Sequence, residues 1–376
     1  MTRATTAEGA VWETRVLAVV TATLVVFGIA AVYGASSVLA VQRGQPGAIF
    51  ALRQALGVIL GGVLFLVCAR LDYHAWARWA WPLIGLSGLL LLVPFVPVAR
   101  TLAPEINGAR RWIDLGFFNF QPSEVAKLAV VAWTAMLAST KGDLVREFRR
   151  GVLPFIVIVL PVSALILFQP NLSTAALVAL LAGVILFTAG ARIGHFLLLG
   201  LAAVPIAWRE VVAVQYRLAR VVSFLSPGED SGHVSWQITQ SVIGVGAGRV
   251  FGVGFGEGQQ KLGYLPYAYS DFLFSTIAEE WGFVGVCLVV LLYAAIIGLG
   301  FRIARTAADR FGMLLATGLT ALIGISAVVH MAVSLGLVPT TGLPLPFLSY
   351  GRSNLVISMV AAGTLVSIGR ARGRLH

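Results

Sequence analysis

Charge is the property that this sequence has least of. Only 11% of its 376 residues are Asp, Glu, Lys or Arg, against roughly a quarter in soluble domains. Hydrophobic residues make up 58% of the chain, and the mean hydropathy is +0.90. So few charged groups cannot hydrate the surface of a folded chain of this size. The composition therefore excludes a soluble globular protein and indicates a lipid bilayer as the main solvent.

Cysteine is also scarce. The two cysteines, Cys68 and Cys287, each lie in an apolar run, which excludes a disulfide framework and a zinc site. No cluster of His, Cys and carboxylate residues has the spacing of metal ligands. The net charge of +11 would suggest nucleic acid as a partner of a soluble chain. Here the basic residues gather in short loops between apolar runs, so they indicate membrane topology instead.

Long apolar runs predict an all-α, polytopic membrane protein with about ten transmembrane helices. Ten spans of about 20 residues would occupy roughly 200 of the 376 positions, and the rest is divided among connecting loops and one longer segment, so that a separate soluble domain does not fit. Residues 1–376 are thus expected to form one membrane domain. The first run is too long and uninterrupted for a cleaved signal peptide. The expected spans lie near residues 15–36, 49–69, 77–98, 123–139, 152–169, 174–191, 193–208, 272–300, 311–337 and 349–369.

The basic residues orient these spans. With ten spans, most of the short arginine-rich and lysine-rich loops fall on one side, which the charge rule assigns to the cytoplasm. Both termini are therefore expected to be cytoplasmic. A large extracytoplasmic loop of about residues 209–271 then lies between helices 7 and 8. The basic residues on the cytoplasmic side include Arg70, Arg78, Lys141, Arg146, Arg149, Arg150, Arg192, Arg302, Arg305 and Arg310.

The first polar segment on the opposite side opens the fourth helix. Pro122, Ser123 and Glu124 form a plausible helix start, with Ser123 as a cap and Glu124 suited to the positive end of the helix. Lys127 lies one turn further on, where Glu124 can reach it at the i, i+3 spacing. One interpretation is a capped helix whose lysine extends to the lipid headgroups.

The other interpretation of this segment is a binding site. Arg110 and Arg111 precede the helix in the run NGARRWI, and arginines present fixed forks of N–H donors that suit phosphate oxygens. Together with Glu124 and Lys127 they would suit an anion or a lipid headgroup. A lipid that carries a pyrophosphate is a chemically sensible ligand for such a group.

The second polar segment, within residues 209–271, is rich in glycine between positions 244 and 258. A dinucleotide fingerprint is excluded, because that motif needs a preceding strand and a βαβ unit, which cannot be built here. Glycine-rich backbone at membrane depth is tolerated where it is buried in protein or lines a cavity. The segment is therefore predicted to be a re-entrant or cavity-lining loop.

Asp271 ends this segment at the start of the eighth span. A carboxylate at the border between solvent and apolar surroundings can have a raised pKa, which suits a general base that acts on a sugar hydroxyl. The alternative is a helix cap formed by Ser270 and Asp271. Further along, Glu279 lies about 80° round the helix from Asp271 and Glu280 about 180°. Acids inside a membrane helix usually face a polar cavity, and Glu279 is the one near the face of Asp271.

The motifs NGARRWI, FQPSEVAKL, QKLGYLP followed by SDF, AEEWGF and PTTGLPLPFLSYG occur in this order along the chain. In this order they resemble the FtsW/RodA (SEDS) family over nearly the whole sequence. The resemblance implies a ten-helix glycosyltransferase that polymerises lipid II at the outer face of the bacterial cytoplasmic membrane. It also implies a class B penicillin-binding protein, a transpeptidase, as the partner. The QKLGYLP spelling and the TTGLPLPF run favour the division-type FtsW branch over the elongation-type RodA branch.

The resemblance also implies roles for individual residues. The family's catalytic aspartate falls on Asp271, its lysine and glutamate fall on Lys127 and Glu124, and its arginine falls on Arg110 or Arg111. Glu279 and Ser349 join these substrate-binding candidates, because each lies in a family motif beside the presumed site. No cofactor is implied with certainty, but the family suggests a divalent cation, Mg²⁺ or Mn²⁺, between a carboxylate and the lipid pyrophosphate.

The sequence departs from the family pattern at several positions. Tyr267 and Tyr269 replace the usual acid and histidine before Asp271, Asn171 replaces an aspartate, and Arg352 adds a cation beside the presumed site. His330 is expected to be a packed, hydrogen-bonded residue of an apolar helix. Two other functions therefore stay open: a lipid II flippase or transporter, and a non-catalytic scaffold for a penicillin-binding protein.

Overall fold

The computed structural model describes residues 2–96, 101–105, 109–116, 118–225 and 233–371. The protein is all-helical, and every expected span corresponds to a helix. In the described residues, nine helices are long and apolar enough to cross a membrane, and α6 is a shorter apolar helix. The ten helices are α1 (Thr2–Gln42), α2 (Ile49–Arg70), α3 (His74–Leu92), α4 (Pro122–Lys141), α5 (Leu153–Phe168), α6 (Leu172–Thr188), α7 (Ile193–Val212), α10 (Leu273–Arg305), α11 (Arg310–Ser334) and α12 (Arg352–Ala371).

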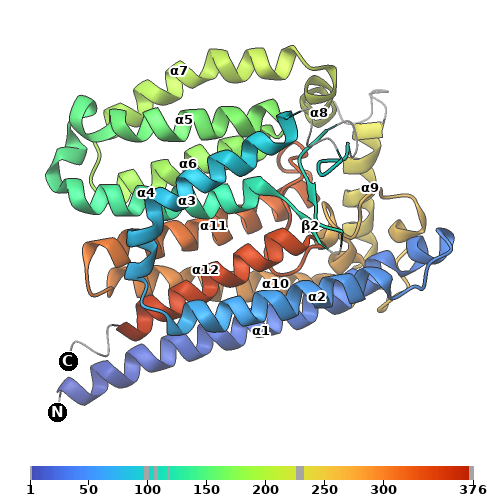
Figure 1. Ribbon diagram of the computed structural model, residues 1–376. Coiled ribbons are helices and arrows are strands. Elements are labelled where there is room, and N and C mark those ends of the chain that lie inside the picture. Colours follow the sequence, from blue (N-terminus) through green and yellow to red (C-terminus); the bar gives the residue numbers. More distant parts are fainter. Residues whose placement is uncertain (1, 97–100, 106–108, 117, 226–232, 372–376) are drawn as a thin grey trace.

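The bundle has two different ends (Figure 1). Both chain termini lie at one end, which we call the termini end. The opposite end, the loop end, holds a ladder of two short antiparallel strands and two extra helices. These elements are β1 (Ile113–Asp114), β2 (Asn119–Phe120), α8 (Gln215–Leu225) and α9 (His233–Ala247). Short 3₁₀ segments flank the helices at Val93–Phe95, Gly142–Arg146 and Gln260–Leu262, and a π-helical turn covers Phe148–Val152.

Helices α11 and α12 form the centre of the bundle. Nearly every side chain of α12 is buried, and α12 packs most extensively against α2. Glycine permits this close approach, because a Cβ added at Gly363 would lie 2.5 Å from the carbonyl oxygen of Phe65. Small residues at helix crossings are the usual means of close packing inside a membrane.

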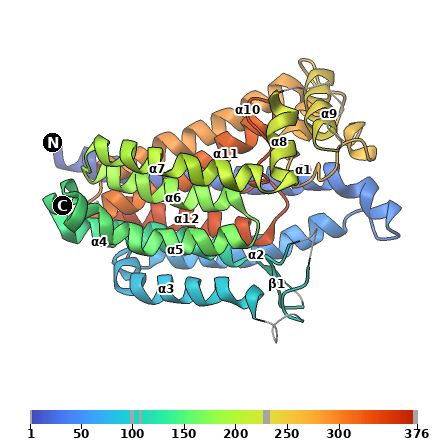
Figure 2. The same ribbon diagram turned by 90° about the horizontal axis from the view of Figure 1, so that it is seen from above.

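Helix α7 is the opposite case. None of its side chains is buried, and it lies at the edge of the bundle beside α5 and α6 (Figures 1 and 2). The sequence predicted the seventh span at residues 193–208, a run that contains Pro205. The structure shows that Pro205 lies inside an unbroken helix of 20 residues.

The segment between α7 and α10 was predicted as a loop, but it is partly helical. Helices α8 and α9 and a 3₁₀ turn at Gln260–Leu262 occupy much of residues 209–271. Their polar residues and glycines hid these helices from a hydropathy-based analysis. At the loop end, α9 packs against α10 and the 3₁₀ turn, and α8 packs against α9 (Figure 2).

Candidate functional site

Asp271 lies in a tight turn at the loop end, just before α10. In this Asp271 turn (Tyr267–Phe272), the backbone N–H groups of Ser270 and Asp271 both donate to the carbonyl oxygen of Tyr267 at 3.0 Å. The helix proper begins at Leu273, its N-cap is Phe272, and no side chain caps it. The helix-cap interpretation of Asp271 is therefore wrong.

The charge of Asp271 is not closely neutralised. Among the described residues, no cation forms an ion pair with it, and the residue is partly buried. Desolvation by the surrounding protein raises the pKa of the Asp271 carboxyl. The charge of Arg220, a hydrogen bond from Ser270 and the charge of Arg111 oppose that rise. A carboxyl with a raised pKa and no bound cation is suited to accept a proton.

The Asp271 turn is fixed by the loop that precedes α12, which we call the Ser349 loop (Thr341–Gly351). The Ser349 hydroxyl donates to the Ser270 carbonyl at 2.7 Å, and the Tyr350 N–H donates to the Tyr269 carbonyl at 3.0 Å. The Ser349 hydroxyl also accepts the N–H of Leu345 at 3.0 Å. Ser349 was predicted to bind substrate, and the structure places its hydroxyl between two protein groups beside Asp271.

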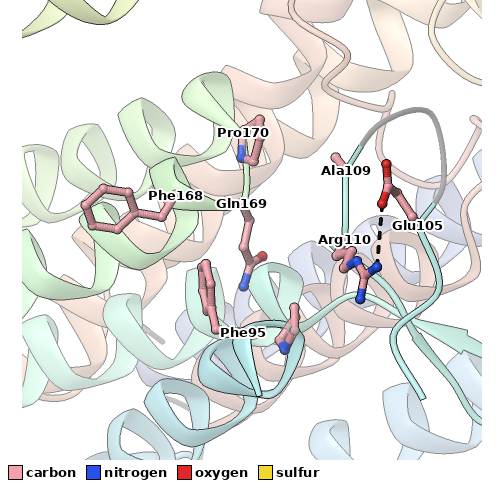
Figure 3. A pocket seen from close by; sticks show the side chains of 8 residues that line it. Phe95, Glu105, Ala109, Arg110, Phe168, Gln169 and Pro170 are labelled. Atoms are coloured by element: carbon pink, nitrogen blue, oxygen red, sulfur yellow. Dashed lines mark ion pairs between the residues drawn. The ribbon is translucent and has the colours of Figure 1, made fainter. Parts of the chain in front are cut away.

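The side chains of Arg110 and Arg111 lie in different surroundings. Arg111 donates through Nε to the Gln169 carbonyl at 2.8 Å and through Nη2 to the Pro170 carbonyl at 2.6 Å. It thereby ties the segment before α4 to the turn between α5 and α6. Arg110 lines a pocket of about 260 Å³, where its Nη2 lies 3.6 Å from a carboxylate oxygen of Glu105 (Figure 3).

The pocket of Arg110 is partly apolar. Phe95 and Phe168 line it from the ends of α3 and α5, and both rings are largely exposed. A cationic fork beside an open apolar wall suits an amphipathic ligand with an anionic head. Asn107 and Gly108, which begin the NGARRWI motif, lie outside the described residues.

Glu124 and Lys127 form a closed ion pair at the start of α4. Lys127 Nζ lies 2.8 Å from Glu124 Oε2, and the same oxygen accepts a hydrogen bond from Asn354 Nδ2 of α12 at 3.1 Å. The predicted i, i+3 contact is confirmed. Lys127 is only 1% exposed, so the interpretation that it extends to the lipid headgroups is wrong. Ser123 is not the cap either, because the N-cap is Gln121 and no side chain caps this helix.

Glu279 and Glu280 bind the glycine-rich segment. Glu279 accepts the N–H groups of Gln259 and Gln260, the shortest at 2.7 Å, and Glu280 pairs with Lys261 at 2.9 Å. Lys261 also donates to the carbonyl oxygen of Gly256. Glu279 was predicted to bind substrate beside Asp271. The structure instead places its carboxylate against the backbone of the 3₁₀ turn.

Helix α10 is broken at the level of these acids. Gly282 adopts φ 64° and ψ −161°, and a Cβ at this position would lie 2.3 Å from the nitrogen of Gly252. The glycine-rich segment was predicted to be a re-entrant or cavity-lining loop. In the structure its first part belongs to α9, and the residues that follow fill the break in α10. Four backbone hydrogen bonds of 2.9 to 3.2 Å join them: Phe283 and Val284 donate to Arg249 and Val250, and Val253 and Gly254 donate to Glu279 and Glu280.

Most departures from the family pattern have local structural roles. The side chain of Asn171 caps α6 by accepting the N–H of Thr174 at 3.3 Å, and Tyr269 packs its ring on Tyr350. Arg352 lies over the ring of Phe118 at 5.0 Å. His330 is buried and forms a 2.8 Å hydrogen bond with the Leu343 carbonyl, as predicted for a packed histidine.

Nothing in the described part of the chain forms a ready metal site, since no group of three or more His, Cys, Asp or Glu residues converges there. Cys68 and Cys287 are both free thiols. A divalent ion at Asp271 would therefore need ligands from a bound phosphate. Mg²⁺ commonly binds in this way, with one or two carboxylates and the oxygens of a substrate phosphate.

Sequence reasoning missed three polar residues that hold the site together. They are Gln54 on α2, Asn354 on α12 and Lys261 in the 3₁₀ turn. Lys261 stands in the QKLGYLP motif and so had a sequence signal, and Asn354 lies two residues after the departure at Arg352. The sequence signal of Gln54 was weaker, because it is only a lone amide in an apolar span.

Comparisons with known proteins agree with this geometry. The family model for FtsW, RodA and SpoVE, described as a cell cycle protein family, matches residues 14–373. The probable peptidoglycan glycosyltransferase FtsW of Trichlorobacter lovleyi is 43% identical over 353 residues, which cover 94% of this chain and 92% of that protein. The stage V sporulation protein E of Bacillus subtilis is 37% identical, over 94% and 96% of the two chains.

Two solved structures share the fold. One chain, from a study of how a peptidoglycan synthase complex coordinates polymerization and crosslinking, aligns with a TM-score of 0.77 at 30% identity and covers 95% of this chain and 97% of that one. The rod shape determining protein RodA of Thermus thermophilus aligns with a TM-score of 0.68 at 29% identity, covering 95% and 96%.

Proposed function

The chain belongs to the family of FtsW, RodA and SpoVE, and from this membership we propose that it uses Asp271 as the general base of glycan polymerisation. It is a peptidoglycan glycosyltransferase of the SEDS family, similar to FtsW, and a multi-pass membrane protein. Lipid II is the proposed substrate. The observation that carries the proposal is the Asp271 turn at the loop end of the bundle, whose carboxyl has a raised pKa and forms no ion pair with the part of the chain that the structure describes.

The proposed step is a displacement at an anomeric carbon. The 4-hydroxyl of the acceptor sugar attacks that carbon of the donor, and a new C–O bond forms. The bond between the anomeric carbon and the lipid pyrophosphate breaks, and the pyrophosphate leaves with the electron pair. The hydroxyl proton passes to the Asp271 carboxylate. A positioned base of this kind typically contributes about a hundred-fold to ten-thousand-fold in rate.

Arg110 is the proposed contact for the departing pyrophosphate. Its guanidinium lines the open pocket, whereas Arg111 is occupied by the carbonyl groups of Gln169 and Pro170. Phe95 and Phe168 provide an apolar wall that suits the lipid chain. Asp271 would be the protein ligand of a Mg²⁺ or Mn²⁺ ion, and such an ion would supply further charge neutralisation there.

The proposed orientation places the loop end outside the cell. The charge rule assigns the arginine-rich turn between α4 and α5 and the basic end of α10 to the cytoplasm, and both lie at the termini end. A class B penicillin-binding protein is the proposed partner, which is supported by the likeness to a chain of a peptidoglycan synthase complex.

The deciding experiment incubates the purified protein with labelled lipid II, with and without a candidate class B penicillin-binding protein. Glycan ladders are expected in at least one of the two conditions. Lipid II that crosses vesicles without forming ladders would favour a transporter. No ladder and no transport, with intact binding of the transpeptidase, would favour a scaffold. The elements that carry the site residues, namely β1, β2 and the starts of α4 and α10, lie at the loop end of the bundle, which supports the polymerase over a carrier open to both leaflets.

A further inference from the structure

We propose that Gln54 is a positioning residue that holds the Asp271 turn in place through the Ser349 loop. This inference rests on the proposed function of Asp271. Gln54 lies on α2, far along the chain from both loops, and it is only 1% exposed. A buried amide is costly unless its polar atoms are hydrogen-bonded, so its partners identify its role.

Both polar ends of the Gln54 side chain bind the same loop. Its Nε2 donates to the Ser349 carbonyl at 3.1 Å, and its Oε1 accepts the N–H of Gly351 at 3.3 Å. The amide thereby bonds to an acceptor before Tyr350 and to a donor after it. The backbone of Ser349, Tyr350 and Gly351 is fixed to α2 at two points.

Two of these three residues, Ser349 and Tyr350, hold the Asp271 turn. The Ser349 hydroxyl donates to the carbonyl of Ser270 at 2.7 Å, and the N–H of Tyr350 donates to the carbonyl of Tyr269 at 3.0 Å. Ser270 precedes Asp271 directly. A chain of hydrogen bonds therefore runs from Gln54 through the Ser349 loop to the residue next to the proposed base.

Aromatic packing follows the same route. Phe50 lies one turn before Gln54 on the same face of α2, and its ring centroid is 5.0 Å from that of Tyr269 and 5.3 Å from that of Tyr350. On the other side of the loop, the Tyr293 hydroxyl of α10 donates to the Pro346 carbonyl. The Ser349 loop is thus anchored by α2 and α10, and Gln54 supplies the polar part of the α2 anchor.

Loss of this anchor should affect turnover more than substrate binding. A displacement of about 1 Å at a reacting group can cost on the order of a hundred-fold in rate. Gln54→Met keeps the length of the side chain but removes both hydrogen bonds. We expect kcat to fall about ten-fold to a hundred-fold, while KM for lipid II changes by less than about three-fold.

The test uses the full-length protein in nanodiscs, with the variants Gln54→Met and Ser349→Ala and the double variant. Ser87→Ala is the matched control, because Ser87 is a buried hydroxyl on α3 that binds only its own helix at the Ile84 carbonyl. Two properties are measured: the rate of lipid II polymerisation, and hydrogen exchange of the backbone amides in residues 267–272 and 345–351.

The proposal predicts faster exchange in both peptides for Gln54→Met and for Ser349→Ala, and unchanged exchange there for Ser87→Ala. It also predicts that the two kinetic effects do not multiply in the double variant, because both substitutions break the same chain of contacts. Unchanged exchange in Gln54→Met, or rate effects that multiply independently, would overturn it. If the wild-type protein forms no ladders, the proposed function fails, whereas the exchange comparison still decides whether Gln54 holds the turn.

Discussion

Two carboxylates at the loop end, Glu124 and Asp271, have opposite surroundings. Glu124 is buried against Lys127 at 2.8 Å and Asn354 at 3.1 Å, so its charge is neutralised in the resting protein. Asp271 has no ion pair in the described part of the chain and keeps part of its surface exposed. The difference separates two tasks. A carboxylate that already has its cation serves the packing of α4 against α12, and one that lacks a cation is available to take a proton.

The sharpest test of this comparison is Asp271→Asn. The amide has nearly the same shape but cannot accept the proton of the sugar hydroxyl. We expect polymerisation of lipid II to fall by about a hundred-fold to ten-thousand-fold. The thermal unfolding midpoint should not fall, because burial disfavours the charge that the substitution removes. Near-normal ladders from the folded variant would refute the assignment of the base.

Lys127→Met should give the reverse pattern, a loss of stability. It leaves the Glu124 carboxylate buried without its cation, which typically costs about 3 to 5 kcal/mol. The measurement is the unfolding midpoint in detergent, followed by scanning fluorimetry. Adding Glu124→Gln to this variant removes the orphaned charge and should restore much of the midpoint. A stable Lys127→Met protein with a raised KM for lipid II would instead make Lys127 a substrate ligand.

Arg110 and Arg111 allow the same comparison between two cations, one that lines the open pocket and one that is bonded to carbonyl groups of the protein. Arg110→Ala should raise KM for lipid II at least ten-fold with a nearly constant unfolding midpoint, since a charged hydrogen bond is worth about 1.5 to 3 kcal/mol. Arg111→Ala should instead lower the midpoint, because two carbonyl groups of the α5–α6 turn lose their donor. Equal kinetic and thermal effects in the two variants would remove the distinction between them.

The pH dependence of polymerisation should report the environment of Asp271. A base must be ionised. The rate should therefore be low at pH values below the pKa of the Asp271 carboxyl and should rise as the pH passes through that pKa. Because desolvation raises that pKa above the ordinary value of about 3.9, the acid limb should lie at a higher pH than for an exposed aspartate. The residual rate of Asp271→Asn should lack this limb. An identical limb in both proteins would assign it to another group.

The smallest effect is expected from a test of orientation, which should leave activity unchanged. In a background where Cys68 and Cys287 are replaced by serine, single cysteines at Glu257 and Asp143 probe the loop end and the termini end. An impermeant thiol reagent added to whole cells should label position 257 but not position 143. The opposite result would place the site on the cytoplasmic side.

The spans could be predicted from the sequence because residues that face the lipid bilayer must be apolar, and long apolar runs are visible in the sequence itself. The contact between Glu124 and Lys127 could be predicted because helix periodicity alone brings the two residues together. The Asp271 turn was located by its motif and its place before an apolar run. The different surroundings of Arg110 and Arg111 could not be predicted, since they depend on where the α5–α6 turn packs.

Long-range partners explain the remaining misses. Asn354 meets Glu124, and Gln54 meets the Ser349 loop, only because α12 packs against α2 and α4. No local pattern encodes such a crossing. The cap assigned to Ser123 failed for a related reason, because the chain enters α4 from the β1–β2 ladder with Gln121 at the cap position.

The break in α10 has a consequence for biogenesis. From Phe283 to Arg305 the chain offers about 23 residues, roughly 34 Å of helix, which is enough to cross a bilayer alone. In the first part of α10, the Glu280 carboxylate is paired only once Lys261 has docked, and the Glu279 carboxylate is hydrogen-bonded only once Gln259 and Gln260 have docked. The membrane-inserted segment and the acid-bearing segment can therefore be completed at different times during synthesis. The active centre would then be assembled last, after the scaffold is already in the membrane.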